Sequence, residues 1–162
     1  MIGYLSGIVI HKDAKHAVID VAGVGYKVYA SFDTLARMPI KEPFNLWIHT
    51  IVREDALDLY GFELQKELDF FKLVIGVSGI GPKSALSIFN VASVDTLSSA
   101  IASGDTSYLT KVSGIGKKIA QKIVLELKDK MAVFAGEQET SDTTRHRDLD
   151  VLEALKSLGY TE

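Results

Sequence analysis

The sequence predicts a multidomain α and β protein in which a small five-stranded β-barrel precedes an all-α domain. Short runs of β-branched and aromatic residues fill the first part of the chain, and apolar residues at helical spacing follow from about residue 63. The helical part also repeats itself. The thirteen residues from Val77, VSGIGPKSALSIF, return almost unchanged thirty-five positions later as VSGIGKKIAQKIV from Val112.

Five strand-like segments make up the predicted barrel domain, residues 1–63. They read YLSGIVIH, HAVIDVAG, GYKVYAS, NLWIHTIVR and LDLYGF. The turn signals between them are Lys12–Asp13, Gly23, Gly25 and Pro43. Five short strands of this kind favour a small barrel.

Residues 64–134 form the predicted all-α domain. Leu64, Leu68, Phe71 and Ile75 share one face of a first helix that begins near Glu63. The longest predicted helix reads KKIAQKIVLELKDKM. Start signals mark the helices between these two: Pro82 in the first turn of PKSALSIF, Ser93 before VDTLSSAIA, and Asp105 before TSYLTKV.

The last part of the chain changes character twice. Residues 135–147, AGEQETSDTTRHR, have no apolar periodicity and are predicted to be a flexible linker. Residues 148–162 contain DLDVLEALKSLGY, whose leucines lie on one helical face. One amphipathic helix of this length is marginal without a partner. We therefore expect an incomplete C-terminal small helical domain.

Composition excludes several kinds of site. The chain has no cysteine, which rules out disulfides, thiolate zinc sites and cysteine nucleophiles. The four histidines, His11, His16, His49 and His146, follow no metal-ligand spacing, so we predict no metal and no cofactor. No segment approaches the roughly 18 apolar residues of a membrane span, and the N-terminus lacks the basic region of a signal peptide. The predicted location is the cytoplasm.

Charge is distributed unevenly along the chain. The net charge is -3, yet residues 72–130 carry eight lysines and four acids, whereas each of the other segments is net negative. The segment that contains both copies of VSGIG is therefore the one basic part of an acidic protein, as a binding site for a polyanion requires.

The Gly-Ile-Gly sequences fit neither common nucleotide-binding motif. A dinucleotide fingerprint needs a third glycine where this chain has Ser84 and Ile119. A P-loop needs a lysine where the first copy has Pro82, and it needs a glycine where the second copy has Lys111. We therefore predict no ATP site.

A helix-hairpin-helix is the remaining interpretation. In this motif a tight Gly-x-Gly turn exposes the first backbone N–H groups of the second helix, which bind phosphate oxygens without reading bases. Lys83, Lys117 and Lys118 add positive charge beside these turns. The alternative is that the glycines only cap helices and the lysines form a solvated face, and two copies argue against it. Two hairpins related by a pseudo-two-fold axis would grip both strands of a duplex.

The chain resembles the RuvA family, the Holliday-junction-binding subunits of the bacterial branch-migration machine. The resemblance covers essentially the whole chain. It lies in MIGYLSG, GVGYKV, VREDALDLYGF, the two hairpins, GIGKKIAQKIVLELKDK and the closing LxxLGY. It implies an OB-like barrel, a tandem helix-hairpin-helix domain, and a homotetramer that becomes an octamer if two tetramers enclose the DNA. It also implies a non-catalytic subunit that binds four-way junctions and directs the RuvB motor ATPase, with the resolvase RuvC as a further partner.

The same resemblance assigns site residues. Glu54 and Asp55 would form an acidic pin at the junction centre, flanked by Arg53, although two acids between strands also suit an ordinary hairpin turn. The phosphate-binding residues implied are Ser78, Gly79, Ile80, Gly81, Lys83, Ser113, Gly114, Ile115, Gly116, Lys117, Lys118 and Lys122. The family pattern continues past LGY with two more helices, so the RuvB-binding domain is expected to be incomplete in this chain.

Two other functions compete with this hypothesis. A helix-hairpin-helix DNA glycosylase or lyase would use Lys118 as its nucleophile, but the position of the assisting aspartate holds Gly136. In a structural interaction module, the tandem hairpins would show no salt-dependent affinity for DNA.

Overall fold

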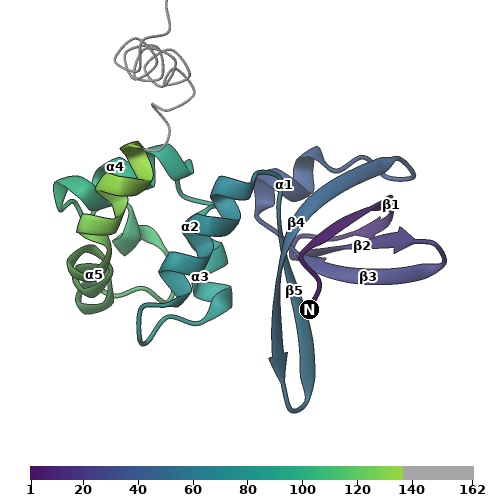
Figure 1. The fold of residues 1–162 in the computed structure, drawn as a ribbon, viewed down its shortest axis with the longest axis horizontal. Coiled ribbons are helices and arrows are strands. Elements are labelled where there is room, and N and C mark those ends of the chain that lie inside the picture. The colour runs from purple at the N-terminus through teal and green to yellow at the C-terminus, as the bar shows by residue number, and fades with distance from the viewer. Residues whose placement is uncertain (137–162) are drawn as a thin grey trace, which may run out of the picture.

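The five strands close into a barrel, as the sequence predicted (Figure 1). The computed structural model describes residues 1–136. The strands are β1 (Tyr4–Lys12), β2 (His16–Val21), β3 (Val24–Tyr29), β4 (Pro43–Arg53) and β5 (Ala56–Phe62). They follow the order β1-β2-β3-β5-β4 around the barrel, in which β3 and β5 are parallel and the other paired strands are antiparallel. The result is an OB-like barrel.

A short helix that the sequence analysis missed, α1 (Phe32–Arg37), closes one end of the barrel. Ser31 begins it by accepting a hydrogen bond from the Thr34 backbone N–H, and Leu35 is buried in the barrel core. The Lys12 ammonium ends it by donating to the carbonyls of Leu35 (2.8 Å) and Met38 (2.6 Å). Six residues are too few to show helical periodicity, so tertiary contacts decide the conformation here.

Residues 64–136 contain helices and the turns that connect them. One predicted helix is not observed. They are α2 (Gln65–Ile75), α3 (Pro82–Ile88), α4 (Val94–Ser103) and α5 (Lys117–Gly136). Pro82 starts α3 and Ser93 caps α4, as predicted. The helix predicted after Asp105 is wrong, because Asp105 binds the Ser107 N–H and hydroxyl in a local turn, and only a 3-10 turn, η1 (Leu109–Lys111), follows.

The C-terminal predictions lie almost wholly outside the described residues. Helix α5 continues to Gly136, so the first two residues of the predicted linker are helical. The remaining linker and the predicted helix of residues 148–162 fall beyond this point, and the domain boundaries themselves stay predictions. Within residues 1–136, no helix combines the length and the apolar character needed to cross a membrane.

Strand β5 belongs to two hydrophobic cores at once. Side chains alternate along a strand, so Leu59 points into the barrel core while Tyr60 and Phe62 point outward into the core of the helical unit. The ring of Phe71 on α2 lies 5.5 Å from Tyr60 and 4.9 Å from Phe62, measured between centroids. The barrel and the helices are therefore positioned by a shared strand rather than by a free linker.

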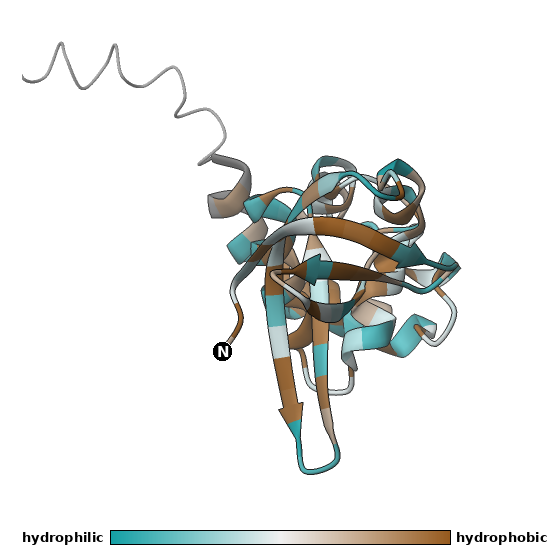
Figure 2. Cartoon of the chain, turned by 90° about the vertical axis from the view of Figure 1, so that its right-hand side faces the viewer, coloured by the Kyte–Doolittle hydropathy of each residue, from teal (hydrophilic) through white to brown (hydrophobic). Residues whose placement is uncertain are grey.

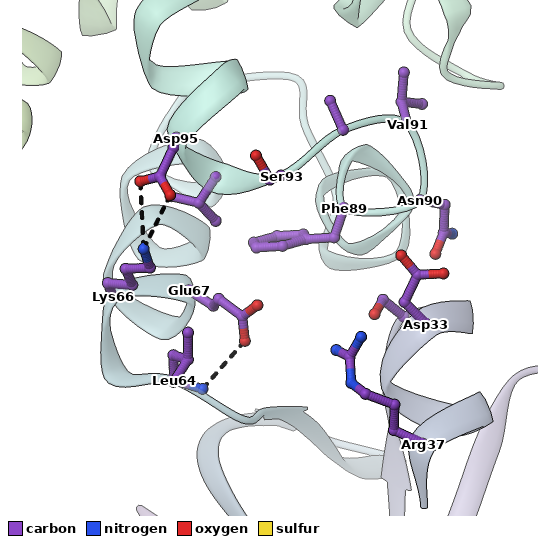
Figure 3. Close-up of a pocket in the computed structure, with 13 residues that line it drawn as sticks. Asp33, Arg37, Leu64, Lys66, Glu67, Phe89, Asn90, Val91, Ser93 and Asp95 are labelled. Carbon is purple, nitrogen blue, oxygen red and sulfur yellow. Dashed lines mark hydrogen bonds and ion pairs between the residues drawn. The ribbon is translucent and has the colours of Figure 1, made fainter.

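Polar contacts between the barrel and the helices supplement this aromatic connection. Arg37 of α1 pairs with Glu63 at 2.7 Å, and Asn90 accepts a hydrogen bond from the Phe32 backbone N–H at 2.8 Å. Within the helical unit, Lys66 of α2 pairs with Asp95 of α4 at 3.1 Å, beside a cavity that Arg37 and Asn90 also line (Figure 3). Exposed ion pairs contribute at most about 1 kcal/mol each, so the shared core supplies most of the coupling.

Replacing Gly7 with alanine should destabilise the barrel. A Cβ at Gly7 would overlap the backbone oxygen of Asp20 and lie 2.8 Å from Cγ2 of Val21, because β1 and β2 approach closely at this point. We expect Gly7→Ala to lower the free energy of unfolding by about 1–3 kcal/mol in urea denaturation. Gly3→Ala is the matched control, since a Cβ at Gly3 meets nothing within 4 Å. Equal stabilities of the two variants would contradict this account.

Candidate nucleic-acid interface

The first VSGIG forms a tight turn between α2 and α3. Val77 and Ile80 are buried, and the Ile80 N–H donates to the Val77 carbonyl at 3.2 Å. Gly79 has φ +96°, which residues with a Cβ rarely adopt. A hydrogen bond from the fourth residue to the first, with positive φ at the third, is the pattern of a type II turn. The turn leaves Ser78, Gly79 and Gly81 exposed.

The second copy repeats these contacts between η1 and α5. The Ile115 N–H donates to the Val112 carbonyl at 3.0 Å, and Gly114 has φ +86°. The next helix begins in the same way in both copies. The Ala85 N–H donates to the Gly81 carbonyl at 3.0 Å, and the Ala120 N–H donates to the Gly116 carbonyl at 2.9 Å. The sequence repeat is thus a structural repeat, with Val, Ile and Ala anchored in the core and Ser and Gly outside.

Two of the hairpin glycines have no structural need to be glycine. Gly81 and Gly116 both lack a positive φ, and a Cβ at either position would meet nothing within 4 Å. Gly81 is the N-cap of α3, where Ser, Asp or Asn would be preferred for helix stability. Open space in front of free backbone amides is what the close approach of a ligand backbone requires.

The two hairpins touch each other across the helical unit. The Lys122 ammonium of α5 donates to the Ser78 carbonyl in the first turn at 3.0 Å. In return, a Cβ at Gly114 in the second turn would lie 3.4 Å from the Ser84 hydroxyl of α3. Each turn therefore lies against the second helix of the other copy. Lys122, which was predicted as a phosphate ligand, has an internal partner that fixes the first turn against α5.

The lysines beside the turns carry uncompensated charge. Lys83, Lys117 and Lys118 are exposed, and within residues 1–136 none of them forms an ion pair. Lys122, in contrast, also lies 3.8 Å from Glu126. The exposed amides and the three free ammonium groups lie next to one another in sequence at the start of α3 and α5. This arrangement suits a polyanion contacted through its phosphates.

The predicted acidic pin is the tip of a long hairpin (Figure 2). β4 and β5 remain paired out to Arg53 and Ala56, beyond their last pairings with β1 and β3, and the two-residue turn is Glu54–Asp55. Both acids are exposed. Arg53 does not accompany them as a free cation, because its guanidinium binds Asp58 at 2.6 Å. This pair lies just behind the tip, and within residues 1–136 neither Glu54 nor Asp55 forms an ion pair.

The histidines are not as scattered as their sequence spacing indicated. The β1–β2 turn brings His11 and His16 next to Asp13, and possible ligand atoms of the three lie within 4.8 Å of one another. Asp13 already has partners in the turn: its carboxylate accepts the N–H groups of Lys15 and His16 and lies 3.1 Å from Nδ1 of His16. These backbone hydrogen bonds lower the pKa of Asp13 below its usual value. A hairpin register, which spacing rules for metal motifs do not consider, produces this cluster.

The geometry required of a glycosylase is missing. Lys118 and Gly136 both lie on α5, and eighteen residues of helix span about 27 Å. A residue at position 136 is therefore too far away to assist a reaction at Lys118, and Gly136 offers no acid in any case. The described residues do not assemble this active site.

An OB-like barrel is joined here to two equivalent hairpins with exposed amides. This combination defines a class of proteins that bind the sugar-phosphate backbone of nucleic acids. Comparisons with known proteins narrow this class. Residues 1–61 match the family model described as RuvA N terminal domain, and residues 71–129 match the one described as SAM-like Helix-hairpin-helix tandem.

Full-length relatives agree with these matches. A Holliday junction branch migration complex subunit RuvA from Thermoanaerobacter sp. (strain X514) is 43% identical over 166 residues, which cover 100% of this chain and 85% of that protein. The protein of the same name from Pseudomonas fluorescens is 40% identical, covering 99% of this chain and 85% of its own length. The one from Clostridium botulinum (strain Alaska E43) is 41% identical, covering 100% and 85%. The chain belongs to the RuvA family.

Proposed function

We propose that this chain is the Holliday-junction-binding subunit of a RuvAB branch-migration complex in homologous recombination and DNA repair. It binds four-way junctions through sugar-phosphate contacts, holds them open and targets the RuvB ATPase motor to them. The pair of equivalent hairpins, in a member of the RuvA family, carries this proposal. The chain itself is non-catalytic, and the motor supplies the chemical energy.

The phosphate contacts are assigned to the exposed parts of both hairpins. The amides that contact phosphates are those of the turn glycines, Gly79, Gly81, Gly114 and Gly116. Ser78 and Ser113 and the amides of Ile80 and Ile115 complete the two turns. The ammonium groups of Lys83, Lys117 and Lys118 add positive charge. None of these groups reads base identity, so binding is independent of sequence. This property suits a junction that migrates, because the sequence at the crossover changes at every step.

The acidic tip contributes selectivity rather than affinity. Glu54 and Asp55 repel phosphates and thereby disfavour continuous duplex at the position where a junction has an open centre. Four such tips would meet in a homotetramer, and two tetramers would enclose the junction as an octamer. RuvB is the partner proposed for the C-terminal domain and RuvC is a further partner, in the bacterial cytoplasm.

A gel-shift titration tests this function directly. The full chain is titrated against a labelled four-way junction and against a duplex of the same length and sequence composition. We expect the junction to bind at least about tenfold more tightly, which corresponds to about 1.4 kcal/mol, with an affinity that falls steeply as salt rises. Equal affinity for the two DNAs would overturn junction recognition. Strand cleavage of damaged duplex by the chain would instead favour the glycosylase alternative.

A further inference from the structure

A second basic surface lies between the barrel and α3. A cavity of about 570 Å³ is lined by the β1–β2 turn, strand β3 and helix α3, and we call it the barrel–helix groove. Three lysines line it, Lys15, Lys27 and Lys83, and within residues 1–136 none of the three is ion-paired. Of the three, only Lys83 lies beside a hairpin in the sequence, and the tertiary fold brings Lys15 and Lys27 to the same cavity.

Acidic groups do not cancel this charge. Asp13 is the one carboxylate that lines the groove, and its oxygens face the N–H groups of Lys15 and His16 and the His16 ring. The cavity in Figure 3 is different in this respect. It is lined by three acids, Asp33, Glu67 and Asp95, and its two basic residues, Arg37 and Lys66, are already paired. Of these two cavities, only the barrel–helix groove has free positive charge.

The floor of the groove is aromatic and uncharged. Tyr29 stacks on Tyr60 with ring centroids 5.5 Å apart, and Tyr60 stacks on Phe71 at the same distance. The Lys27 ammonium lies 5.2 Å from the centroid of Tyr29. Burial raises the pKa of Tyr60 to about 12, so its hydroxyl stays neutral at physiological pH. Lys27 thus lies beside an aromatic surface that other buried rings support from behind.

The groove is continuous with the first hairpin. Lys83 lies two residues after Gly81 and belongs to both surfaces. Leu86 and Ser87 extend the groove along α3, and Asn90 lines it just after the end of that helix. The same Asn90 binds the Phe32 backbone, so the wall from α3 is fixed to the barrel. The first hairpin and the groove are therefore adjacent surfaces that share Lys83.

We propose that the barrel–helix groove binds the sugar-phosphate backbone of the DNA arm held by the first hairpin, with Lys15 and Lys27 as additional phosphate ligands from the barrel. This inference rests on the proposed function, since it names further contacts to the same DNA. It makes the barrel a direct, sequence-independent contributor to affinity. The ligand class follows from the unpaired ammonium groups and from the continuity with Lys83.

The test is the salt dependence of junction binding by Lys15→Ala/Lys27→Ala. Each lost phosphate contact should reduce the magnitude of the slope of log K against log salt by about 0.9. For the double variant we expect this magnitude to fall by about 2 for each protomer that contacts DNA. Lys128→Ala/Lys130→Ala, which removes the same charge from exposed positions of α5, is the control and should keep the slope nearly unchanged. Lys15→Arg/Lys27→Arg should restore it.

The outcomes separate this inference from the proposed function. If the unmodified chain fails to prefer a junction, the proposed function is wrong. If the unmodified chain binds junctions normally and the Lys15/Lys27 variant keeps its full slope, or loses no more than the Lys128/Lys130 control, only the groove inference is overturned. Both double variants change exposed lysines, and their thermal unfolding midpoints should match that of the unmodified chain.

Discussion

Gly81→Ser combined with Gly116→Ser should leave the fold as stable as before and weaken junction binding by about two orders of magnitude. Serine is at least as good an N-cap as glycine, so stability should stay equal or rise by a few tenths of a kcal/mol. Its hydroxyl oxygen would accept the N–H groups at the start of α3 and α5, and its side chain would fill the open space in front of them. Both effects remove phosphate contacts that are worth about 1.5 kcal/mol or more per hairpin.

The opposite signs of these two effects make the experiment decisive. Urea denaturation measures the stability, and a junction gel-shift titration measures the affinity. Gly3→Ser is the matched control, because a side chain at Gly3 also meets open space but lies in the barrel. If the double variant is as stable as the unmodified chain and binds the junction equally well, the hairpins are not the phosphate clamps. The interaction-module alternative would then account better for the repeat.

Local pattern predicted the elements whose conformation local forces decide. The barrel strands, the start of α3 at Pro82 and the cap of α4 at Ser93 all follow from turn chemistry, capping and alternation. The two hairpins could be predicted because the VSGIG motif occurs twice in the sequence. Helix α1 was missed and η1 was predicted as a longer helix, because segments of three to six residues take their conformation from tertiary contacts.

Contacts between residues that are far apart in the sequence could not be predicted from local patterns. Lys122 binds the carbonyl of Ser78, forty-four residues away, and no periodicity indicates that contact. The barrel–helix groove likewise joins Lys15 and Lys27 to Lys83 only because Tyr60 and Phe62 hold the barrel against α2. The hairpin residues could thus be proposed as ligands from the sequence pattern alone, whereas the extent of the basic surface depends on how the two cores share β5.

Neutralising the acidic tip should strengthen binding to duplex DNA and thereby reduce the preference for junctions. Glu54→Gln/Asp55→Asn keeps the size and shape of both side chains, and both are exposed, so the fold should be unaffected. Each removed charge repels nearby phosphates by about 1 kcal/mol in water at 4 Å separation. We expect duplex affinity to rise about tenfold at low salt and the preference for junctions over duplex to fall by a similar factor. The variant leaves Asp58 unchanged, so Arg53 keeps its ion pair and does not become a free cation.

Salt and a charge-matched control distinguish repulsion at the tip from a general effect of net charge. Glu42→Gln/Asp33→Asn removes two exposed acids elsewhere on the barrel unit and should leave selectivity nearly unchanged. The gain in duplex affinity should shrink as ionic strength rises toward about 1 M, where the Debye length is about 3 Å. Duplex binding that stays the same or weakens in the Glu54/Asp55 variant would show that the tip does not act by repelling DNA. An equal gain in the control would assign the effect to net charge, because only position separates the two pairs of acids.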